Sequence, residues 1–344
     1  MRRLIYLIAT GLLACSSAIL ALAVDVSAAK LKGFAPLPPV VDSGSNPLTE
    51  EKIALGRMLY FDPRLSRDQK VSCNSCHDLY KYGVDNEATS TGFRSQHGGR
   101  NAPTVYNAAA HFVQFWDGRA PDVEAQAKGP VMNPVEMAMP SEEHVVKVLK
   151  SIPEYVGRFE KSFPGSKDPV SLTNAAKAIG AFERKLMTPS RFDAFLKGDA
   201  GALNDAEKKG LLKFVDAGCS ACHNGALLGG GSYQKLGVAR DYPNLQDKGV
   251  AEISKKDEDK FRFKVPSLRN ITKTGPYFHN GAVATLDAAI LQMSEYQLGK
   301  PLTQADIKSI ATFLDALTGP LPKEYIKAPK LPASTPQTPK PESD

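Results

Sequence analysis

The pattern Cys-x-x-Cys-His occurs twice in this chain, at residues 73–77 and 219–223. Two thiols at this spacing attach covalently to a haem, and the histidine that follows ligates its iron. A redox thiol pair or half of a zinc site is the alternative, but a zinc site needs a further thiol or histidine pair close by, and neither copy has one. The sequence therefore predicts two c-type haems, bound by Cys73, Cys76, His77, Cys219, Cys222 and His223.

Length and charge narrow the remaining possibilities. The 344 residues suit two domains of ordinary size, one for each haem motif. The net charge of +6 is modest, and no long run of lysine and arginine accompanies it, so nucleic-acid binding has little support.

The N-terminus resembles an export signal over residues 1–28. Arg2 and Arg3 precede an apolar run that is followed by a small-residue cleavage site, Val26-Ser27-Ala28. Covalent haem attachment of this type takes place outside the bacterial cytoplasm, so signal and motifs together predict a periplasmic protein. An uncleaved anchor is one alternative, and a lipid-anchored Cys15 is another; the apolar run continues past Cys15, which favours ordinary cleavage.

Helical patterns dominate the rest of the chain, and no convincing strand is found. After a Pro- and Gly-rich lead-in at 29–48, amphipathic helices are expected from Thr49, over 141–152 and 171–186, and from Asn204, Thr285 and Thr303. Residues 78–140 lack a period, as long functional loops do.

The predicted fold class is all-α, with two cytochrome-c-like haem domains. The expected boundaries are 49–188 for the N-terminal domain and 189–320 for the C-terminal domain, with a short linker near Pro189. Residues 321–344 form an extension whose tail, from about residue 330, is rich in Pro, Ser, Thr and charge and is predicted to be disordered.

The sixth ligand of each haem decides its chemistry, because a haem with two strong axial ligands transfers electrons and an open one binds a small molecule. Met293 is the candidate in the second half, since it shares an apolar helical face with Leu286 and Ile290. Core packing is the alternative role for such a methionine. Spacing alone leaves both open.

Several longer motifs occur in a fixed order along the chain. They are residues 73–77, Gly-Gly-Arg-Asn-Ala-Pro-Thr at 98–104, Gln-Phe-Trp-Asp-Gly-Arg at 114–119, Ala-Gln-Ala-Lys-Gly-Pro at 125–130, Val-Glu-Met at 135–137, residues 219–223, and Gly-Pro-Tyr-Phe-His-Asn-Gly at 275–281. Over about residues 47–320 the chain resembles the bacterial dihaem cytochrome c peroxidase family. MauG, which oxidises a protein substrate, belongs to a related branch.

This resemblance implies a low-potential peroxidatic haem in the N-terminal domain, with His77 as its proximal ligand. It implies a high-potential haem in the C-terminal domain, with His223 and Met293 as axial ligands. By the same resemblance Glu136 is the catalytic glutamate and Gln126 its companion.

The resemblance also implies groups between the haems. Trp116 matches the tryptophan that lies between them. A calcium ion at the domain interface would take the side chain of Asn101 and the carbonyls of Thr274 and Pro276, which are oxygen ligands that suit a hard cation.

One position departs from the family pattern. Many members hold a removable distal histidine in the loop after the first haem motif, and this chain has Phe93 there. Since phenylalanine cannot ligate iron, we hypothesise that the first haem is open in the fully oxidised protein. His97 is the rival ligand, and an exposed loop histidine without a metal role is the simpler interpretation. No role is assigned to His111, His144 and His279.

The resemblance implies an enzyme that reduces hydrogen peroxide to water with electrons from a small cytochrome c or cupredoxin, and it suggests a homodimer. A MauG-like oxidase is one alternative, which Tyr296 would favour as the axial ligand in place of Met293. A dihaem electron carrier without turnover is the other alternative, and it would leave Glu136 and Gln126 without a task.

Overall fold

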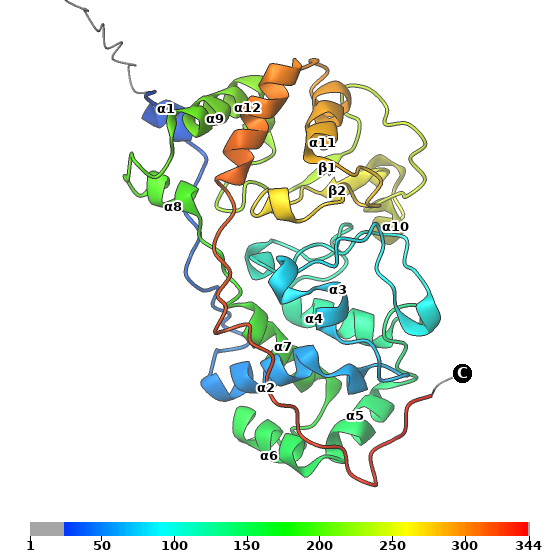
Figure 1. The fold of residues 1–344 in the computed structure, drawn as a ribbon. Helices are drawn as coiled ribbons and strands as arrows, with labels where there is room; N and C mark the ends of the chain where they lie inside the picture. Colours follow the sequence, from blue (N-terminus) through cyan, green and yellow to red (C-terminus); the bar gives the residue numbers. More distant parts are fainter. Residues whose placement is uncertain (1–23, 343–344) are drawn as a thin grey trace, which may run out of the picture.

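The computed structural model of the chain describes residues 24–342. The fold is mostly helical, as expected, and Figure 1 shows the helices gathered in two lobes. Each lobe has its own hydrophobic core. One cluster of buried side chains includes Leu55 and Phe182, and another includes Phe192 and Phe313.

The first lobe contains α2 (Glu50–Phe61), α4 (Val123–Met132), α5 (Glu142–Lys150), α6 (Pro153–Ser162) and α7 (Leu172–Glu183). The predicted start at Thr49 is confirmed, because its hydroxyl accepts a hydrogen bond from the Lys52 backbone N–H. Ser141 and Ser171 cap α5 and α7 in the same way. Short-range capping therefore sets where these helices begin.

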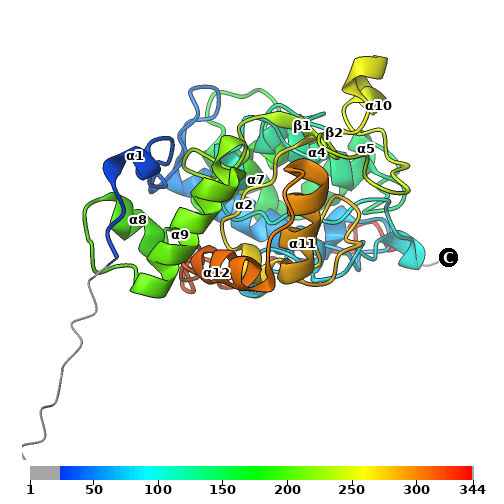
Figure 2. The same ribbon diagram turned by 90° about the horizontal axis from the view of Figure 1, so that it is seen from above.

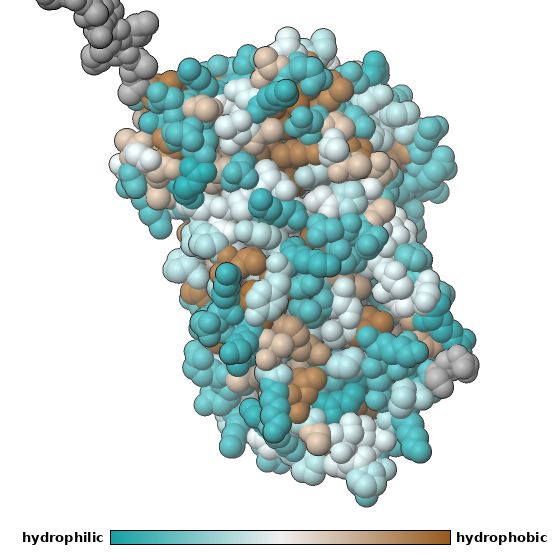
Figure 3. Space-filling view, in the orientation of Figure 1, coloured by the Kyte–Doolittle hydropathy of each residue, from teal (hydrophilic) through white to brown (hydrophobic). Residues whose placement is uncertain are grey.

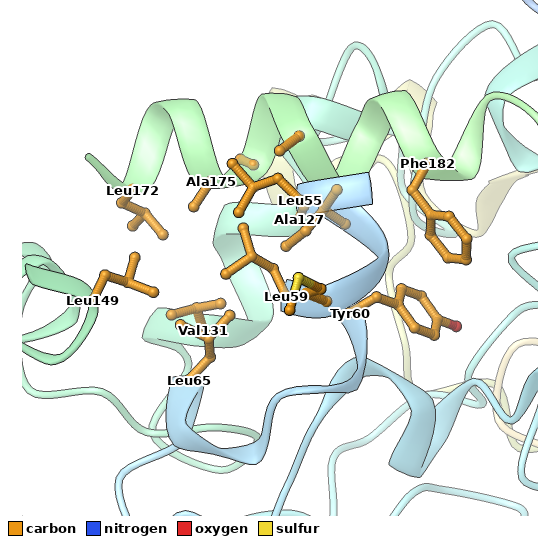
Figure 4. Packing of buried hydrophobic residues seen from close by; sticks show 14 of the residues in the cluster. Leu55, Leu59, Tyr60, Leu65, Ala127, Val131, Leu149, Leu172, Ala175 and Phe182 are labelled. Atoms are coloured by element: carbon orange, nitrogen blue, oxygen red, sulfur yellow. The ribbon is translucent and has the colours of Figure 1, made fainter. Parts of the chain in front are cut away.

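The core of the first lobe forms where α2 packs against α7, and Figure 4 shows its side chains converging between the helices. The two backbones approach closely at Gly56, where a Cβ atom would lie 1.8 Å from the carbonyl oxygen of Ala178. Leu55, Leu59 and Phe182 are fully buried beside this contact. The packing positions α2 just ahead of the first haem motif.

The second lobe contains α8 (Arg191–Leu196), α9 (Asp205–Ala217), α11 (Leu286–Gln292) and α12 (Gln304–Asp315). Asn204 with Glu207 forms a capping box at the start of α9, and Thr303 with Asp306 forms one at α12, as the sequence predicts. α9 packs on α12 and ends at Gly218, whose φ of 100° turns the chain directly into the second motif.

The remaining helices and strands are short. They are α1 (Ala28–Leu31), α3 (Cys73–Cys76), α10 (Ala251–Ser254), β1 (Tyr233–Lys235) and β2 (Arg262–Lys264). β1 and β2 pair antiparallel with Gln234 opposite Phe263, which corrects the expectation of no strands. Strands of three residues are too short to show a period in the sequence. In Figure 2, α10 projects from the edge of the molecule.

The expected irregular stretch at 78–140 is interrupted by α4, which carries Pro130 in its last turn. A proline and a glycine near the end of a short helix hide its period in the sequence. The chain then folds back on α4, since the Met137 N–H donates to the Pro130 carbonyl at 3.1 Å. This return places residues 133–139 beside the helix.

Both ends of the described chain run between the lobes. Phe34 packs on the second core, and the Val41 N–H then donates to the Arg184 carbonyl of the first lobe at 3.2 Å. The C-terminal stretch returns from α12 in the same way, and Ile326 is fully buried in the first core. The N-terminal and the C-terminal segments of the described chain therefore each contact both lobes.

Residues 330–342 have a defined course along the first lobe, which differs from the disordered tail that the composition predicts. The Arg64 guanidinium donates to the Pro332 carbonyl at 2.9 Å, and the Thr335 hydroxyl donates to the Ser151 carbonyl at 2.8 Å. Polar partners on the lobe satisfy the backbone of this Pro-rich segment. Composition could not reveal them, because they lie far away in the sequence.

The predicted signal falls almost wholly on residues 1–23, including Cys15, which lie outside the described residues. Export, cleavage and lipid attachment therefore stay predictions. No helix within residues 24–342 is long and apolar enough to cross a membrane.

Candidate functional site

The first Cys-x-x-Cys-His motif forms a single helical turn, α3. Ser72 and Ser75 cap it reciprocally, and the His77 N–H donates to the Cys73 carbonyl at 2.9 Å. The turn places Cys73 and Cys76 one above the other and carries the imidazole at its end. The order of these groups comes from the motif, and the Tyr60 hydroxyl, which donates to the His77 carbonyl at 2.6 Å, fixes the end of the turn from α2.

The second motif has the same local geometry. Cys219–Ala221 form a tight turn directly after Gly218, and the His223 N–H donates to the Cys219 carbonyl at 3.0 Å. In both copies a helix delivers two thiols and then a histidine. The repetition at the level of structure supports one use for both copies.

Both motif histidines are held in one orientation. His77 Nδ1 lies 3.3 Å from the Gly83 carbonyl oxygen, and His223 Nδ1 lies 3.0 Å from that of Leu228. A histidine that donates through Nδ1 keeps the Nε2 lone pair available for a metal. Burial lowers the pKa of both rings, so both are neutral and suited to ligate iron.

A cavity of about 240 Å³ adjoins the second motif. Cys219, Cys222 and His223 line it, and its other walls are largely apolar side chains such as Leu286, Ile290, Leu302, Ile310 and Leu314. Figure 3 shows apolar surface within this upper lobe among polar surroundings. Apolar walls, two thiols and a neutral imidazole fit a covalently attached haem.

The structure separates the two candidates for the second axial ligand. Met293 lines the same cavity as His223, at the point where α11 passes into a π-helical turn over Met293–Gln297. Tyr296 does not line the cavity; its ring packs 5.1 Å from that of Tyr242 and under the Arg240 guanidinium. The placement favours Met293, which remains a prediction as a ligand.

Glu136 lies in the neighbourhood of the first motif. Burial raises the pKa of the Cys76 thiol to about 11, and the nearby carboxylates of Asp85 and Glu136 add to this rise. Glu136 itself is half-buried, and burial raises its pKa, while Arg119 and Asn133 oppose the rise. A carboxyl group with a raised pKa holds a proton more readily than an exposed glutamate does, which suits a group that transfers protons.

The loop that carries Phe93 is in direct contact with Glu136. The Phe93 N–H donates to the Glu136 carbonyl at 2.7 Å, and a Cβ atom on Gly92 would lie 2.1 Å from the Val135 carbonyl oxygen. The Phe93 side chain is buried, with 4% exposed. The structure thus brings together the position of the expected distal ligand and the predicted catalytic glutamate.

His97 lies at the stem of the same loop, on the surface. Its Nδ1 is 3.1 Å from the Thr89 carbonyl oxygen, and its backbone pairs with Thr91. The exposed position supports the interpretation of His97 as a loop histidine without a metal role. Gln126, the predicted companion of Glu136, lies half-buried on α4.

Trp116 lies at the junction of the lobes. Its indole N–H donates to the Asn101 carbonyl at 2.9 Å, and its ring lies edge-on to His279, with centroids 6.5 Å apart. Both Trp116 and Asn101 line the cavity of the second motif. The ring is therefore placed on the side of that cavity that faces the first lobe.

An ionic network at this junction was missed by sequence reasoning. The Arg100 guanidinium pairs with Asp117 and, at 2.6 Å, with Asp247, and Arg119 also pairs with Asp117. Arg100, Asp117 and Arg119 lie inside the motifs at 98–104 and 114–119. Membership of these motifs is the only feature of the sequence that points to them. The network holds the Trp116 segment against the second lobe.

A buried Lys264–His111 pair lies beside it and was also missed. Lys264 Nζ is 2.8 Å from His111 Nδ1 and donates to the Val113 carbonyl at 3.1 Å. Burial lowers the pKa of Lys264 to about 7, with Asp117 opposing, and burial together with Lys264 keeps His111 neutral by lowering its pKa. Both residues line the cavity.

The predicted calcium ligands Asn101, Thr274 and Pro276 all line the same cavity region. The Asn101 amide donates to the Glu87 carbonyl at 2.9 Å, which leaves its oxygen as the potential ligand. Within residues 24–342 no three His, Cys, Asp or Glu side chains gather around a metal-sized site. The calcium site stays a prediction that rests on backbone carbonyls and one amide.

Comparisons with known proteins agree with this site. A family model described as di-haem cytochrome c peroxidase matches residues 50–201. The chain is 46% identical to the cytochrome c551 peroxidase of Pseudomonas aeruginosa over 90% of each chain, and 43% identical to that of Nitrosomonas europaea over 92% of this chain and 94% of the other.

Relatives of another branch are more distant. The methylamine utilization protein MauG of Methylorubrum extorquens is 37% identical over 72% of this chain and 69% of its own length. Among solved structures, a MauG-like protein associated with microbial copper homeostasis superposes with a TM-score of 0.76 and 27% identity, covering 85% of this chain and 97% of that one.

Proposed function

Because this chain belongs to the di-haem cytochrome c peroxidase family, we infer that it reduces hydrogen peroxide to water. The relatives that are 46% and 43% identical over at least 90% of this chain are named cytochrome c551 peroxidases. The observation in the structure that carries this function is the placement of a half-buried carboxyl, Glu136, beside the first haem motif.

The chain offers a complete set of residues for two covalently bound haems, each in a cytochrome-c-like domain. Cys73 and Cys76 would bind one, with His77 as ligand. The thiols of residues 219 and 222 would bind the other, with His223 and Met293 as ligands. When bound, the first haem supplies the iron at which peroxide is cleaved, and the second supplies a relay for electrons. Covalent attachment is tested by denaturing the protein and asking whether haem fluorescence under ultraviolet light stays with the polypeptide.

The reaction consumes one peroxide, two electrons and two protons and gives two waters. Cleavage of the O–O bond requires a proton to move from the near peroxide oxygen to the departing one. The Glu136 carboxylate takes that proton and delivers it, and its raised pKa suits both steps. The Gln126 amide orients peroxide or water beside it.

Phe93 has a separate role in this proposal. Its buried ring occupies the loop position of the expected distal histidine and cannot ligate iron. The first site would therefore accept peroxide in the fully oxidised protein, without prior reduction. His97 is exposed in the loop stem, which supports this proposal.

Electrons would come from a small cytochrome c or cupredoxin in the periplasm and enter at the second lobe. They would pass near Trp116, whose ring lies at the junction of the lobes and shortens the path through protein. A calcium ion held by Asn101, Thr274 and Pro276 would stiffen the same junction. A homodimer is proposed from family membership alone.

The alternatives have less support. A MauG-like oxidase is expected to use tyrosine at the second haem, whereas Met293 and not Tyr296 lines the cavity. A pure electron carrier gives no task to Glu136 or to the open position beside Phe93. Sustained peroxide turnover by the purified protein would exclude the carrier.

The test of the proposed function is Glu136→Gln in the haem-loaded protein. We expect peroxide reduction with reduced cytochrome c to fall by about a hundredfold or more, because a positioned acid–base group contributes roughly 10²–10⁴. Glu154→Gln, which changes an exposed glutamate on α6, is the control and should keep full activity. Equal activity of the Glu136 variant and the parent would contradict the assignment, provided that haem content is the same.

A further inference from the structure

The C-terminal segment, defined here as residues 330–342, ends at Arg67, a residue that lies over the Phe93 ring, although the proposed reaction does not use the segment. Figure 1 shows it following the first lobe to the end of the described chain. Two hydrogen bonds fix its course ahead of the last residues. The Gln69 amide donates to the Pro339 carbonyl at 2.8 Å, and the Ser151 hydroxyl donates to the Thr338 hydroxyl at 2.9 Å. These contacts bring Glu342 to a defined place.

Arg67 receives this end of the chain. The Glu342 N–H donates to the Arg67 carbonyl at 3.0 Å, and the Arg67 guanidinium donates through Nε to the Glu342 carboxylate at 2.7 Å. On its other side, the Arg67 N–H donates to the Met137 carbonyl at 2.8 Å. A continuous set of hydrogen bonds thus joins the C-terminal segment to the residue next to Glu136.

The Arg67 side chain also lies over Phe93. Its guanidinium carbon is 5.6 Å from the centre of the Phe93 ring, and that of Arg94 is 5.1 Å from the same ring. Two cations at one aromatic ring are each attracted to it but repel one another. The Glu342 carboxylate is the counter-charge of Arg67, so it stabilises the arrangement of both arginines around Phe93.

The Phe93 loop needs such outside contacts. Arg94 and Ser95 have positive φ angles of 52° and 58°, a conformation that persists only where the surroundings hold it. The loop is coupled to Glu136 by the 2.7 Å hydrogen bond from the Phe93 N–H and by the close packing of Gly92 on Val135. A shift of Phe93 therefore shifts Glu136.

We propose that Glu342 is a positioning residue of the peroxide site: it fixes Arg67, which holds the Phe93 ring and the 136–137 turn in place for proton transfer. This proposal rests on the proposed peroxidase function. The C-terminal segment would thus influence the reaction indirectly, through Arg67 and Phe93, without contacting the haem ligands or the electron path.

Two variants test it in the haem-loaded protein: Glu342→Gln, which removes the charge, and a chain that ends at Pro339, which keeps the earlier anchors. Glu154→Gln is the matched control, because the Arg158–Glu154 pair is exposed to a similar degree, 39% and 51% against 37% and 46% for Arg67–Glu342. The readouts are the rate constant for peroxide reduction, the rate of cyanide binding to the oxidised first haem, and the melting temperature.

We expect both Glu342 variants to reduce peroxide about two- to fivefold more slowly, since an exposed ion pair is weak. Cyanide binding should become faster, because cyanide needs access past Phe93 but no correctly placed Glu136. The melting temperature and the control should not change. Opposite changes in the two rates are a result that a merely structural role would not produce.

Unchanged rates in both variants would overturn the proposal, as would equal changes in Glu154→Gln. Slowing of both reactions together with a lower melting temperature would also overturn it, since general destabilisation has that effect. A parent protein without peroxidase activity would refute the proposed function instead, and the cyanide rates would still decide the role of Glu342.

Discussion

Glu183 is a buried carboxyl group close to the first haem motif. Only 4% of it is exposed, and burial, with a contribution from the Glu124 carboxylate, raises its pKa to about 8, while Arg184 opposes the rise. Its charge would in turn raise the pKa of the Cys73 thiol, which is already raised by burial. A protonated Glu183 is compatible with this buried position, whereas an unpaired carboxylate is costly there.

The titration of Glu183 gives a testable pH dependence. Since its pKa is about 8 when folded and ordinary, near 4.5, when unfolded, the folded state alone holds the proton between these values. The free energy of unfolding should therefore fall as the pH rises from about 4.5 to 8 and then level off. Glu183→Gln should remove about 2–4 kcal/mol of this fall.

Urea unfolding of the parent and of Glu183→Gln at pH 5, 6.5 and 8 measures this effect. Glu154→Gln, at an exposed glutamate, is the control and should follow the parent. If the Glu183 variant and the parent lose stability in parallel over this range, the account of Glu183 is wrong.

At the scale of residues, the haem motifs are predictable because the spacing of their two thiols and the histidine lies within five consecutive residues. Glu136 and Phe93 could be selected only through longer motifs, and the contact between them requires the fold. Arg67 and Lys264 gave no signal, because their partners Glu342 and His111 lie far away in the sequence. Pairs of this kind become visible only when the chain is folded.

At the scale of elements, the site depends on the packing of α2 on α7, which presents the first motif. Gly56 permits this contact, because any Cβ there would lie 1.8 Å from the Ala178 carbonyl oxygen. The buried clusters show a similar close approach at Gly210 in α9, where a Cβ would lie 2.1 Å from the Ser309 carbonyl oxygen of α12. In each lobe, a glycine thus permits the close approach of two packed helices.

Gly56→Ala should destabilise the protein by about 1–3 kcal/mol, because the added methyl group forces α2 away from α7. Gly157→Ala in α6 is the matched control: nothing lies within 4 Å of its Cβ position, so alanine should stabilise that helix by about 0.5–1 kcal/mol. Urea denaturation measures both. A neutral Gly56→Ala would show that the two helices are not in this contact.

Helix starts were predictable where a capping residue and an apolar face coincide, as at Thr49, Asn204 and Thr303. α4 was not, because Pro130 and its glycine neighbour suggest a loop. The course of residues 330–342 was not predictable either, since it follows from hydrogen bonds to Arg64, Ser151 and Arg67 and not from composition.

At the scale of the whole molecule, the two lobes share one junction. The lead-in and the C-terminal stretch cross between them, and Arg100, Asp117 and Asp247 join them beside Trp116. The cavity of the second motif opens on this junction through Trp116 and Asn101. In the proposed function, this junction would lie between electron entry in one lobe and peroxide chemistry in the other.

The central claim is that the first haem is open to peroxide in the fully oxidised protein because Phe93 replaces a ligand. An electron paramagnetic resonance spectrum of the oxidised protein, recorded before and after addition of peroxide, tests it most directly. We expect a high-spin ferric signal that peroxide consumes. Two low-spin signals that do not respond to peroxide would contradict the claim, because they would mean that His97 or another ligand closes the site.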